Sequence, residues 1–199
     1  MAKQYTIIVL HIEIEGIHPR IWRRIAVDGD HSLRMLHHII QAAFGWTDAH
    51  LHEYQVEECA FCMFDNVNVQ ETLGESDREE RDERKAILKR LLHPGQKFTY
   101  LYDFGDSWTH TITVEKIETR PDYRGSATII DGQRAAPPED VGGIPGYEEF
   151  LDAILHHEHS EEARQYLRWA GGSFDPEAFD RRIANAALLR LAWNGWGKK

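Results

Sequence analysis

The stretch YDFGDSWTH, residues 102–110, brings two carboxylates and an imidazole close together in the sequence. Asp103 and Asp106 flank its glycine, and His110 ends it. A carboxylate that orients an imidazole occurs in metal sites and in general-base pairs. The same residues also suit a hairpin turn, in which Asp103 bonds turn amides and His110 is a buried core residue. The stretch is therefore a candidate site with a structural alternative.

Two further histidines, His50 and His52, lie two residues apart in a predicted strand, so both side chains would face the same way. Two imidazoles on one face supply half of a zinc or iron site, and their alternative is a structural role at the sheet margin. His50, His52 and His110 are the candidate metal ligands, and a divalent metal is the only candidate cofactor. His37 borders the apolar stripe of a predicted helix, whereas His38 is expected to face away from it.

The proline-rich stretch APPEDVGGIPGY presents Glu139 and Asp140 on a stiff stem. Pro137 and Pro138 fix an extended backbone, and the glycines that follow permit close backbone approach. These acids either bind a ligand or bond backbone amides where the chain approaches a helix at Tyr147.

A basic stretch, PRIWRR, places Arg20, Arg23 and Arg24 around Trp22, which could grip phosphate or stack on a base. However, acidic residues outnumber Lys and Arg by 33 to 23, and the net charge of -10 disfavours nucleic acid and anionic membranes. An edge strand guarded by charge is the alternative.

Cys59 and Cys62 form a C-x-x-C pair without the second pair or the βαβ unit that metal and redox motifs need. We expect two small, partly buried residues in a reducing compartment. No charged leader and no apolar run of ~20 residues is present, so we expect a cytoplasmic protein without a membrane partner.

Hydrophobic periodicity indicates the elements that position these residues. It predicts strands over 4–15 and 20–27, a helix over 33–44 capped by Ser32 and Gly45, and a charged helix from Ser76 to Leu92. It then predicts a hairpin whose turn spans 104–107 with Gly105 at positive φ. An irregular connection over about 120–146 follows, in which SATII is a possible strand, and helices are predicted to begin near Tyr147, Glu161 and Asp175. The prediction is a single compact α+β domain over 1–195, mainly an antiparallel sheet packed by helices with a C-terminal helical cluster, and a tail over 196–199.

Several long motifs resemble, in order, the plasmid pRiA4b ORF-3-like family: PRIWRRIAV, LHHIIQAAFGWTDAHLHEY, FTYLYDFGDSWTHTITVE, APPEDVGGIPGYEEFL and FDPEAFDRRIAN. The resemblance implies a compact α+β fold and a context of plasmids or insertion elements, without an established reaction. It makes the motif residues the candidates for a shared ligand site: Trp46, His50, Asp103, Asp106, Trp108, His110, Glu139 and Asp140.

Relatives carry cysteines where this chain has Ile130 and Val141, so a thiolate metal site is not expected. The resolvase-like label of some relatives lacks support, since no recombinase nucleophile or helix-turn-helix is present.

We expect the candidate imidazoles and carboxylates to converge in a cleft that the PPED stretch closes against a sheet edge. The leading hypothesis is a non-enzymatic binding or accessory protein, linked to plasmids or insertion elements, with a protein or small-molecule partner, because no complete catalytic constellation is present. The alternative is a metal-dependent hydrolase or nuclease-like enzyme. The second alternative is direct nucleic-acid binding through the arginines.

Overall fold

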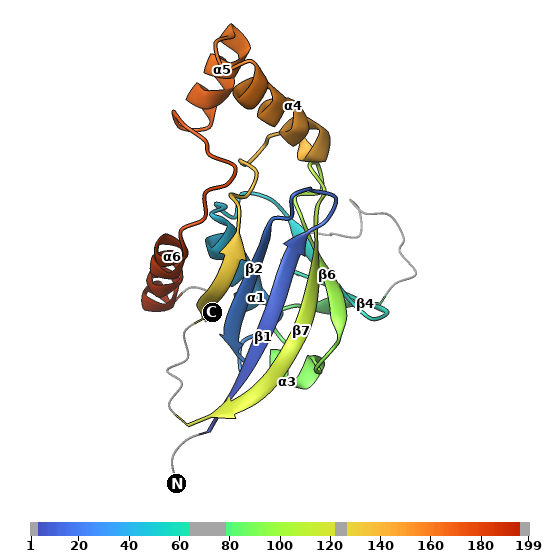
Figure 1. Ribbon diagram of the computed structural model, residues 1–199. Helices are drawn as coiled ribbons and strands as arrows, with labels where there is room; N and C mark the ends of the chain where they lie inside the picture. The colour runs from blue at the N-terminus through green and yellow to red at the C-terminus, as the bar shows by residue number, and fades with distance from the viewer. Residues whose placement is uncertain (1–3, 64–78, 122–126, 196–199) are drawn as a thin grey trace.

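Alternating apolar and polar residues build eight β-strands that form one mixed sheet (Figure 1). The computed structural model describes residues 4–63, 79–121 and 127–195. Within them the strands are β1 Tyr5–Ile14, β2 Trp22–Asp28, β3 His52–Val56, β4 Cys59–Cys62, β5 Glu79–Asp82, β6 Lys97–Tyr102, β7 Trp108–Arg120 and β8 Thr128–Gln133. The helices are α1 Leu33–Phe44, α3 Leu88–Leu91, α4 Gly143–His156, α5 Glu161–Trp169 and α6 Arg181–Asn194. The predicted α+β class is confirmed.

The strands follow the spatial order β5-β4-β3-β6-β7-β1-β2-β8, and every neighbouring pair except β4 with β5 is antiparallel. His52 at the start of β3 lies opposite Tyr102 at the end of β6, and Tyr102 lies opposite Trp108 at the start of β7. The chain before β3 and the β6–β7 turn therefore meet at one end of the sheet. Helices α4 and α5 lie beyond that end (Figure 1).

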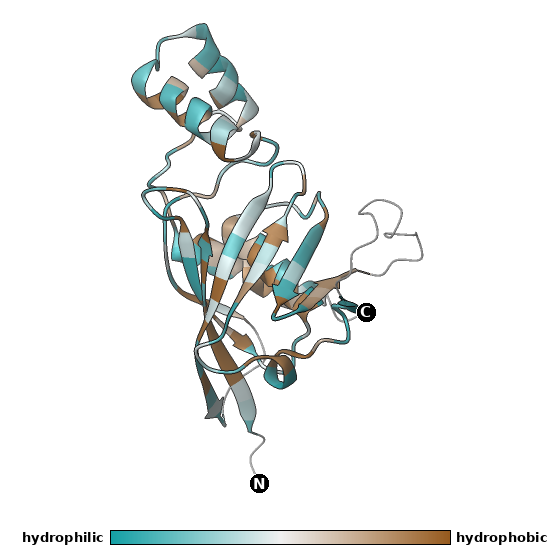
Figure 2. Ribbon diagram, turned by 90° about the vertical axis from the view of Figure 1, so that its right-hand side faces the viewer, coloured by the Kyte–Doolittle hydropathy of each residue, from teal (hydrophilic) through white to brown (hydrophobic). Residues whose placement is uncertain are grey.

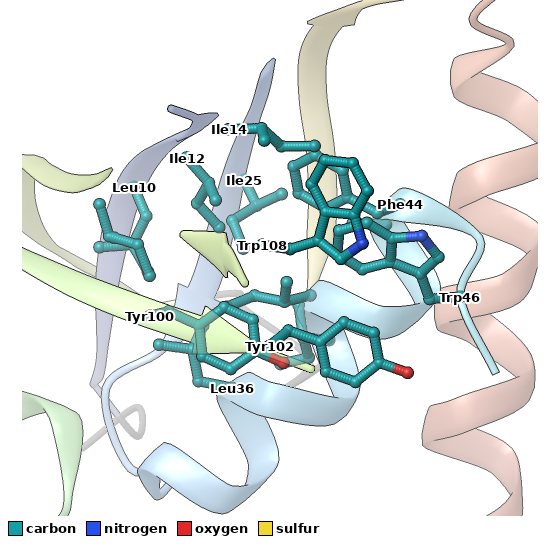
Figure 3. Close-up of a cluster of buried hydrophobic side chains, with 14 of the residues drawn as sticks. Leu10, Ile12, Ile14, Ile25, Leu36, Phe44, Trp46, Tyr100, Tyr102 and Trp108 are labelled. Carbon is teal, nitrogen blue, oxygen red and sulfur yellow. The ribbon is translucent and has the colours of Figure 1, made fainter. Parts of the chain in front are cut away.

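Helix α1 packs its apolar stripe against one face of the sheet. Its two ends are capped as predicted. The Ser32 side chain accepts a hydrogen bond from the Met35 amide, and Gly45 ends the helix at φ 83°. Figure 3 shows side chains of β1, β2 and α1 gathered with the aromatic residues of the β6–β7 hairpin. The strands in Figure 2 alternate between hydrophobic and hydrophilic bands, as expected when successive side chains face core and solvent.

His110 and Trp108 belong to this core and do not reach a ligand site. Both are buried, and the His110 ring makes edge contacts with Phe44 and Trp46 at 5.2 and 5.4 Å. His110 Nδ1 lies 2.9 Å from the Trp108 carbonyl oxygen, to which it donates. Burial lowers the pKa of His110 to about 4, because it penalises the charged imidazolium. His110 is therefore a buried core residue, with its Nδ1 hydrogen-bonded and its Nε2 without a hydrogen-bond partner among the described residues.

Two predicted helices were wrong in type or extent. The charged segment before Leu92 contains strand β5 and the single turn α3 in its described part, whereas Ser76 lies outside the described residues. The hydrogen bonds that β5 makes with β4 outweigh a helical charge pattern that contributes only tenths of a kcal/mol per pair. The last helix begins at Arg181 after the cap Asp180, not at Asp175.

Arg23 is a buried structural residue rather than a nucleic-acid contact. Its guanidinium donates to four carbonyl oxygens, 2.8–3.0 Å away, and lies between two aromatic rings, those of Phe44 and Phe179. The accepting oxygens belong to Ala43 near the end of α1, to Trp22, to Gln133 at the end of β8 and to Arg134 after it. Burial lowers the pKa of Arg23 to about 10, which leaves it protonated at neutral pH. Arg23 thus ties α1 to the chain that follows β8.

Replacing Arg23 with Ala should lower the free energy of unfolding by about 3 kcal/mol, because buried carbonyls lose their charged donor. Urea unfolding at pH 7 measures the change. The matched control is Arg20→Ala, whose side chain is 66% exposed, with an expected change within about 0.5 kcal/mol. Equal losses in the two variants would contradict the structural role of Arg23.

His110 should also make the protein less stable in mild acid. Its pKa lies below the ordinary value of 6.5, so between pH 6.5 and 4 the unfolded chain binds a proton that the folded chain does not. Between pH 6 and pH 5 the unfolding free energy of the unsubstituted protein should fall by about 1 kcal/mol more than that of His110→Asn. Urea titrations at both pH values test this. His159→Asn, which removes a side chain that is 94% exposed, should keep the original pH dependence.

Candidate functional site

The PPED loop, which we define as residues 135–142, crosses the end of the sheet that carries the β6–β7 turn. The Trp46 indole N–H donates to the Pro137 carbonyl oxygen over 2.9 Å, and the Gly142 amide donates to the Asp106 carboxylate over 3.0 Å. The loop is thereby fixed at one end to the chain after α1 and at the other to the hairpin turn. The structure thus brings together residues 102–110 and 137–143.

Glu139 is the central anchor of this loop. Its carboxylate accepts hydrogen bonds from the Thr47 amide at 2.7 Å, the Thr47 hydroxyl at 3.1 Å and the Tyr102 hydroxyl at 3.1 Å. The Tyr102 oxygen in turn accepts from the Ala49 amide at 3.2 Å. Burial, followed by the charge of Glu139, raises the pKa of Tyr102, so its hydroxyl keeps the proton that it donates. One carboxylate therefore joins the PPED loop, the α1–β3 connection and β6.

Two glycines after the loop permit this close approach. A Cβ at Gly143 would lie 2.6 Å from the Asp106 carbonyl oxygen, and one at Gly146 would lie 2.0 Å from the carbonyl oxygen of Val141. A side chain at position 143 would force the chain away from the hairpin, and one at position 146 would force α4 away from the end of the loop.

Three ligand-type side chains meet beneath this loop. The Nε2 atom of His50 lies 2.9 Å from an Asp140 oxygen and 3.6 Å from an Asp103 oxygen. Their side chains are 28% exposed for His50, 67% for Asp140 and 11% for Asp103, so the cluster opens to solvent on the Asp140 side. His50 Nε2 is itself buried and makes no hydrogen bond of acceptable geometry within the described residues.

The turn conformation orients Asp103 toward this cluster. Its Oδ1 accepts from the Gly105 amide at 2.9 Å, which leaves Oδ2 facing His50. Asp103 has φ 56°, a left-handed conformation that Asp tolerates better than most residues. The prediction that Gly105 takes positive φ was wrong, since Asp103 and Ser107 do so instead. Asp103 therefore bonds turn amides and also faces the cluster.

This arrangement has the chemistry of a metal site with open coordination positions. The three ligand atoms lie within 4.8 Å of one another. Ligands bound to one ion at about 2.1 Å are themselves about 3.0–3.4 Å apart, and the two spacings from His50, 2.9 and 3.6 Å, lie close to that range. One imidazole and two carboxylates would leave the remaining positions for water or substrate.

The cluster adjoins a hollow of about 320 Å³ beside β3, which we call the β3 hollow. Its rim is apolar at Leu51, which is 60% exposed, and at Phe104. Apart from Ala49, the other lining residues are polar or contain sulfur: Arg34, Asp48, Ala49, His50, His52, Glu53, Cys62 and Met63.

His52 is not part of the cluster of His50, Asp103 and Asp140, contrary to the prediction that His50 and His52 act together. His50 precedes the strand, whereas His52 begins it and points inward, where its ring stacks on His37 with centroids 3.5 Å apart. His52 Nε2 lies 2.7 Å from a carboxylate oxygen of Glu83, which is fully buried. A buried carboxylate thus explains why an imidazole faces the interior.

His37 and His38 share the carboxylate of Asp48. Its two oxygens lie 2.5 Å from His37 Nε2 and 3.1 Å from His38 Nδ1, so the expectation that His38 faces away was wrong. Burial lowers the pKa of His37 to about 4 although Asp48 opposes the shift. Burial raises the pKa of Asp48, but its hydrogen bonds with both histidines outweigh this and lower it. Neutral His37 therefore donates from Nε2 to Asp48 and accepts at Nδ1 from the Tyr100 hydroxyl.

Sequence reasoning missed four residues that organise this end of the molecule: Thr47, Asp48, Glu83 and Tyr102. Thr47 and Asp48 lie within a motif already quoted, FGWTDAHLHEY, so their position beside His50 was a usable signal. Glu83 gave no signal, because its pairing with His52 depends on the contact of β4 with β5.

The remaining arginines of PRIWRR are paired rather than presented as a basic patch. Arg24 makes a bidentate contact with Glu115 at 2.8–3.0 Å, and Arg20 lies 3.5 Å from Glu13. The Trp22 indole donates to the Gln133 side chain over 3.3 Å. Arg23 is buried, so of the three arginines only Arg20 and Arg24 reach solvent, each beside a carboxylate.

The two cysteines do not form a metal or redox pair in the described chain. They are three residues apart in β4, which places their side chains on opposite faces of the strand. Burial raises the pKa of Cys62 to about 11, so its thiol is not activated.

Comparison with known proteins places the chain in a family. The model of the plasmid pRiA4b ORF-3-like protein family matches residues 6–183. The uncharacterized protein y4hQ of Sinorhizobium fredii (strain NBRC 101917 / NGR234) is 33% identical over 196 residues, which span 98% of this chain and 96% of that protein. The crystal structure of a protein of unknown function, MM3350 from Methanosarcina mazei Go1, is similar with a TM-score of 0.77 and 33% identity, covering 92% of this chain and 98% of that one. No helix in the described part of the chain is long and apolar enough to cross a membrane. The chain belongs to the plasmid pRiA4b ORF-3-like family.

Proposed function

We propose that this member of the plasmid pRiA4b ORF-3-like family is a metal-dependent hydrolase. The observation that carries the proposal is the meeting of His50, Asp103 and Asp140, which come from three separate segments. Mixed nitrogen and oxygen ligands suit Zn²⁺, Mn²⁺ or Fe²⁺. The expected ligand set therefore keeps His50 from the metal ligands predicted from sequence and has Asp103 and Asp140 in place of His52 and His110.

A bound divalent cation would supply Lewis acidity and lower the pKa of a coordinated water toward neutrality. In the reaction that we propose, the water oxygen forms a bond to a carbonyl carbon or a phosphorus atom, and the bond from that atom to the leaving-group oxygen breaks. The leaving-group oxygen takes one proton of the water, and the other stays on the new hydroxyl group. Asp140, the most exposed of the three ligands, lies on the side from which substrate and water can enter.

The β3 hollow provides a place for the substrate beside the cluster. Leu51 and Phe104 can contact an apolar group, and Arg34 offers a partly exposed guanidinium. Arg34 lies 3.3 Å from Glu83, so part of its charge is already compensated. These features favour an ester or phosphoester with an apolar substituent.

A second candidate is a non-enzymatic binding or accessory protein, favoured by the exposed Leu51 at the rim of the β3 hollow. In that role the same cluster would hold a metal that orders the site for a partner or small molecule. A link to plasmids or insertion elements is compatible with both candidate functions, and only the family description supports it.

Protein purified without chelator and without affinity histidines should contain close to one divalent transition metal ion per chain, measured by elemental analysis. His50→Ala and Asp140→Asn should lower the metal content to near zero, because each removes a ligand; Asn preserves the left-handed backbone at position 140, where φ is 58°. The control His159→Ala removes an exposed imidazole outside the cluster and should retain the metal. Absence of metal from the unsubstituted protein, or full retention by His50→Ala, would refute the site.

Turnover separates the two candidates. With Mn²⁺ or Zn²⁺ added, the protein should hydrolyse p-nitrophenyl acetate or bis-p-nitrophenyl phosphate, lose activity with chelator and regain it with metal. Asp140→Asn should reduce the rate by at least about tenfold at saturating metal. Stoichiometric metal without turnover of either probe would favour the binding protein over the hydrolase.

A further inference from the structure

A second hollow, of about 350 Å³, lies between the PPED loop and α5. We call it the α5 hollow. Helix α5 contributes residues at helical spacing and the loop contributes two more, so that six residues line it: Asp140, Val141, Glu162, Gln165, Tyr166 and Trp169. Asp140 thus belongs to both the metal cluster and this hollow.

The charge of the α5 hollow is negative, although one of its two carboxylates, Asp140, lies 2.9 Å from His50 Nε2. Its lining contains two carboxylates, Asp140 and Glu162, and no basic side chain. The nearest arginines along α5, Arg164 and Arg168, both pair with Glu161 at 3.2 and 3.0 Å. Within the described residues Glu162 makes no ion pair. A positive ligand would therefore meet no competing cation in the hollow.

Two aromatic rings in the hollow are held in fixed orientations. Trp169 and Tyr166 both make edge contacts with Phe150, at centroid distances of 6.2 and 5.4 Å. Phe150 is completely buried, so it forms a rigid support for both rings. Trp169 remains 48% exposed and can present indole surface to a ligand. Aromatic faces attract cations through their electron-rich π-systems.

We infer that the α5 hollow binds an organic cation, an alkylammonium or guanidinium group. Carboxylates at Asp140 and Glu162 provide the charge, and the aromatic residues provide a surface that desolvates an alkylated cation at low cost. The volume suits a group the size of a side chain rather than a whole macromolecule. That the cation belongs to the substrate of the metal centre rests on the proposed function, whereas cation binding itself does not.

Calorimetric titration of the full-length, chelator-treated protein with n-propylguanidinium and with tetramethylammonium, at 150 mM NaCl, tests the inference. Both cations should bind, and neutral neopentyl alcohol, which has the shape of tetramethylammonium, should bind at least about fivefold more weakly. Trp169→Leu retains apolar volume without the indole and should weaken cation binding about two- to fivefold. Equal affinity for the cation and the neutral probe would overturn the inference.

The adjacent glutamates provide a matched pair of variants. Glu162→Gln removes a carboxylate that lines the hollow and should weaken cation binding severalfold, whereas Glu161→Gln removes the same charge from the arginine-paired neighbour and should change it little. Equal weakening in both would indicate general attraction to an acidic protein and would also overturn the inference.

The link to the metal centre has its own readout. With Mn²⁺ bound, an ester that carries an ammonium group on a short alkyl arm should be hydrolysed faster than its neutral counterpart, and Glu162→Gln should abolish the difference. Cation binding without any turnover would leave the inference intact and count against the proposed hydrolase. Turnover of both esters at the same rate would support the hydrolase and count against the link between the α5 hollow and the substrate.

Discussion

The hydrogen bonds of the Glu139 carboxylate are the constraint on which the candidate site depends. They join three segments that are distant in the sequence, because the acceptor lies in the PPED loop and its donors lie at Thr47 and Tyr102. His50 and Asp140 are close neighbours of these residues in the chain, so the same bonds that order the loop also bring the imidazole to the carboxylate. Glu139 is not one of the three candidate metal ligands, but its hydrogen bonds hold His50 and Asp140 close together.

The acids at this end of the molecule also depend on backbone conformations that most residues avoid. Asp48, Asp103 and Asp140 all have φ between 56° and 59°. Such conformations cost free energy and are characteristic of functional sites, where surrounding contacts fix them. Here the contacts are visible: Asp48 is held by two histidines, Asp103 by turn amides, and Asp140 by anchors on both sides of it. The loops that contain these unfavourable backbone conformations therefore also contain the contacts that stabilise them.

Regular periodicity made much of the fold predictable, and non-local pairing limited the rest. The strand at β1, helix α1 and the β6–β7 hairpin follow from residues that are adjacent in sequence. The helix predicted before Leu92 failed because β5 takes its hydrogen bonds from β4 rather than from itself. For the site, YDFGDSWTH and the PPED stretch identified Asp103 and Asp140 as candidates. The sequence could not predict that His50 and His52 lie in different environments. The difference depends on where the chain enters β3 and on the buried Glu83.

Asp140 gives the two proposed ligands a common electrostatic dependence. It is shared by the metal cluster and the α5 hollow, so a cation in either place reduces the negative potential that attracts a cation to the other. Linkage requires this effect to be equal in both directions. Glu162, which lies in the hollow but outside the cluster, retains its charge when a metal is bound. The hollow therefore keeps one carboxylate of its own for a substrate cation while Asp140 serves the metal.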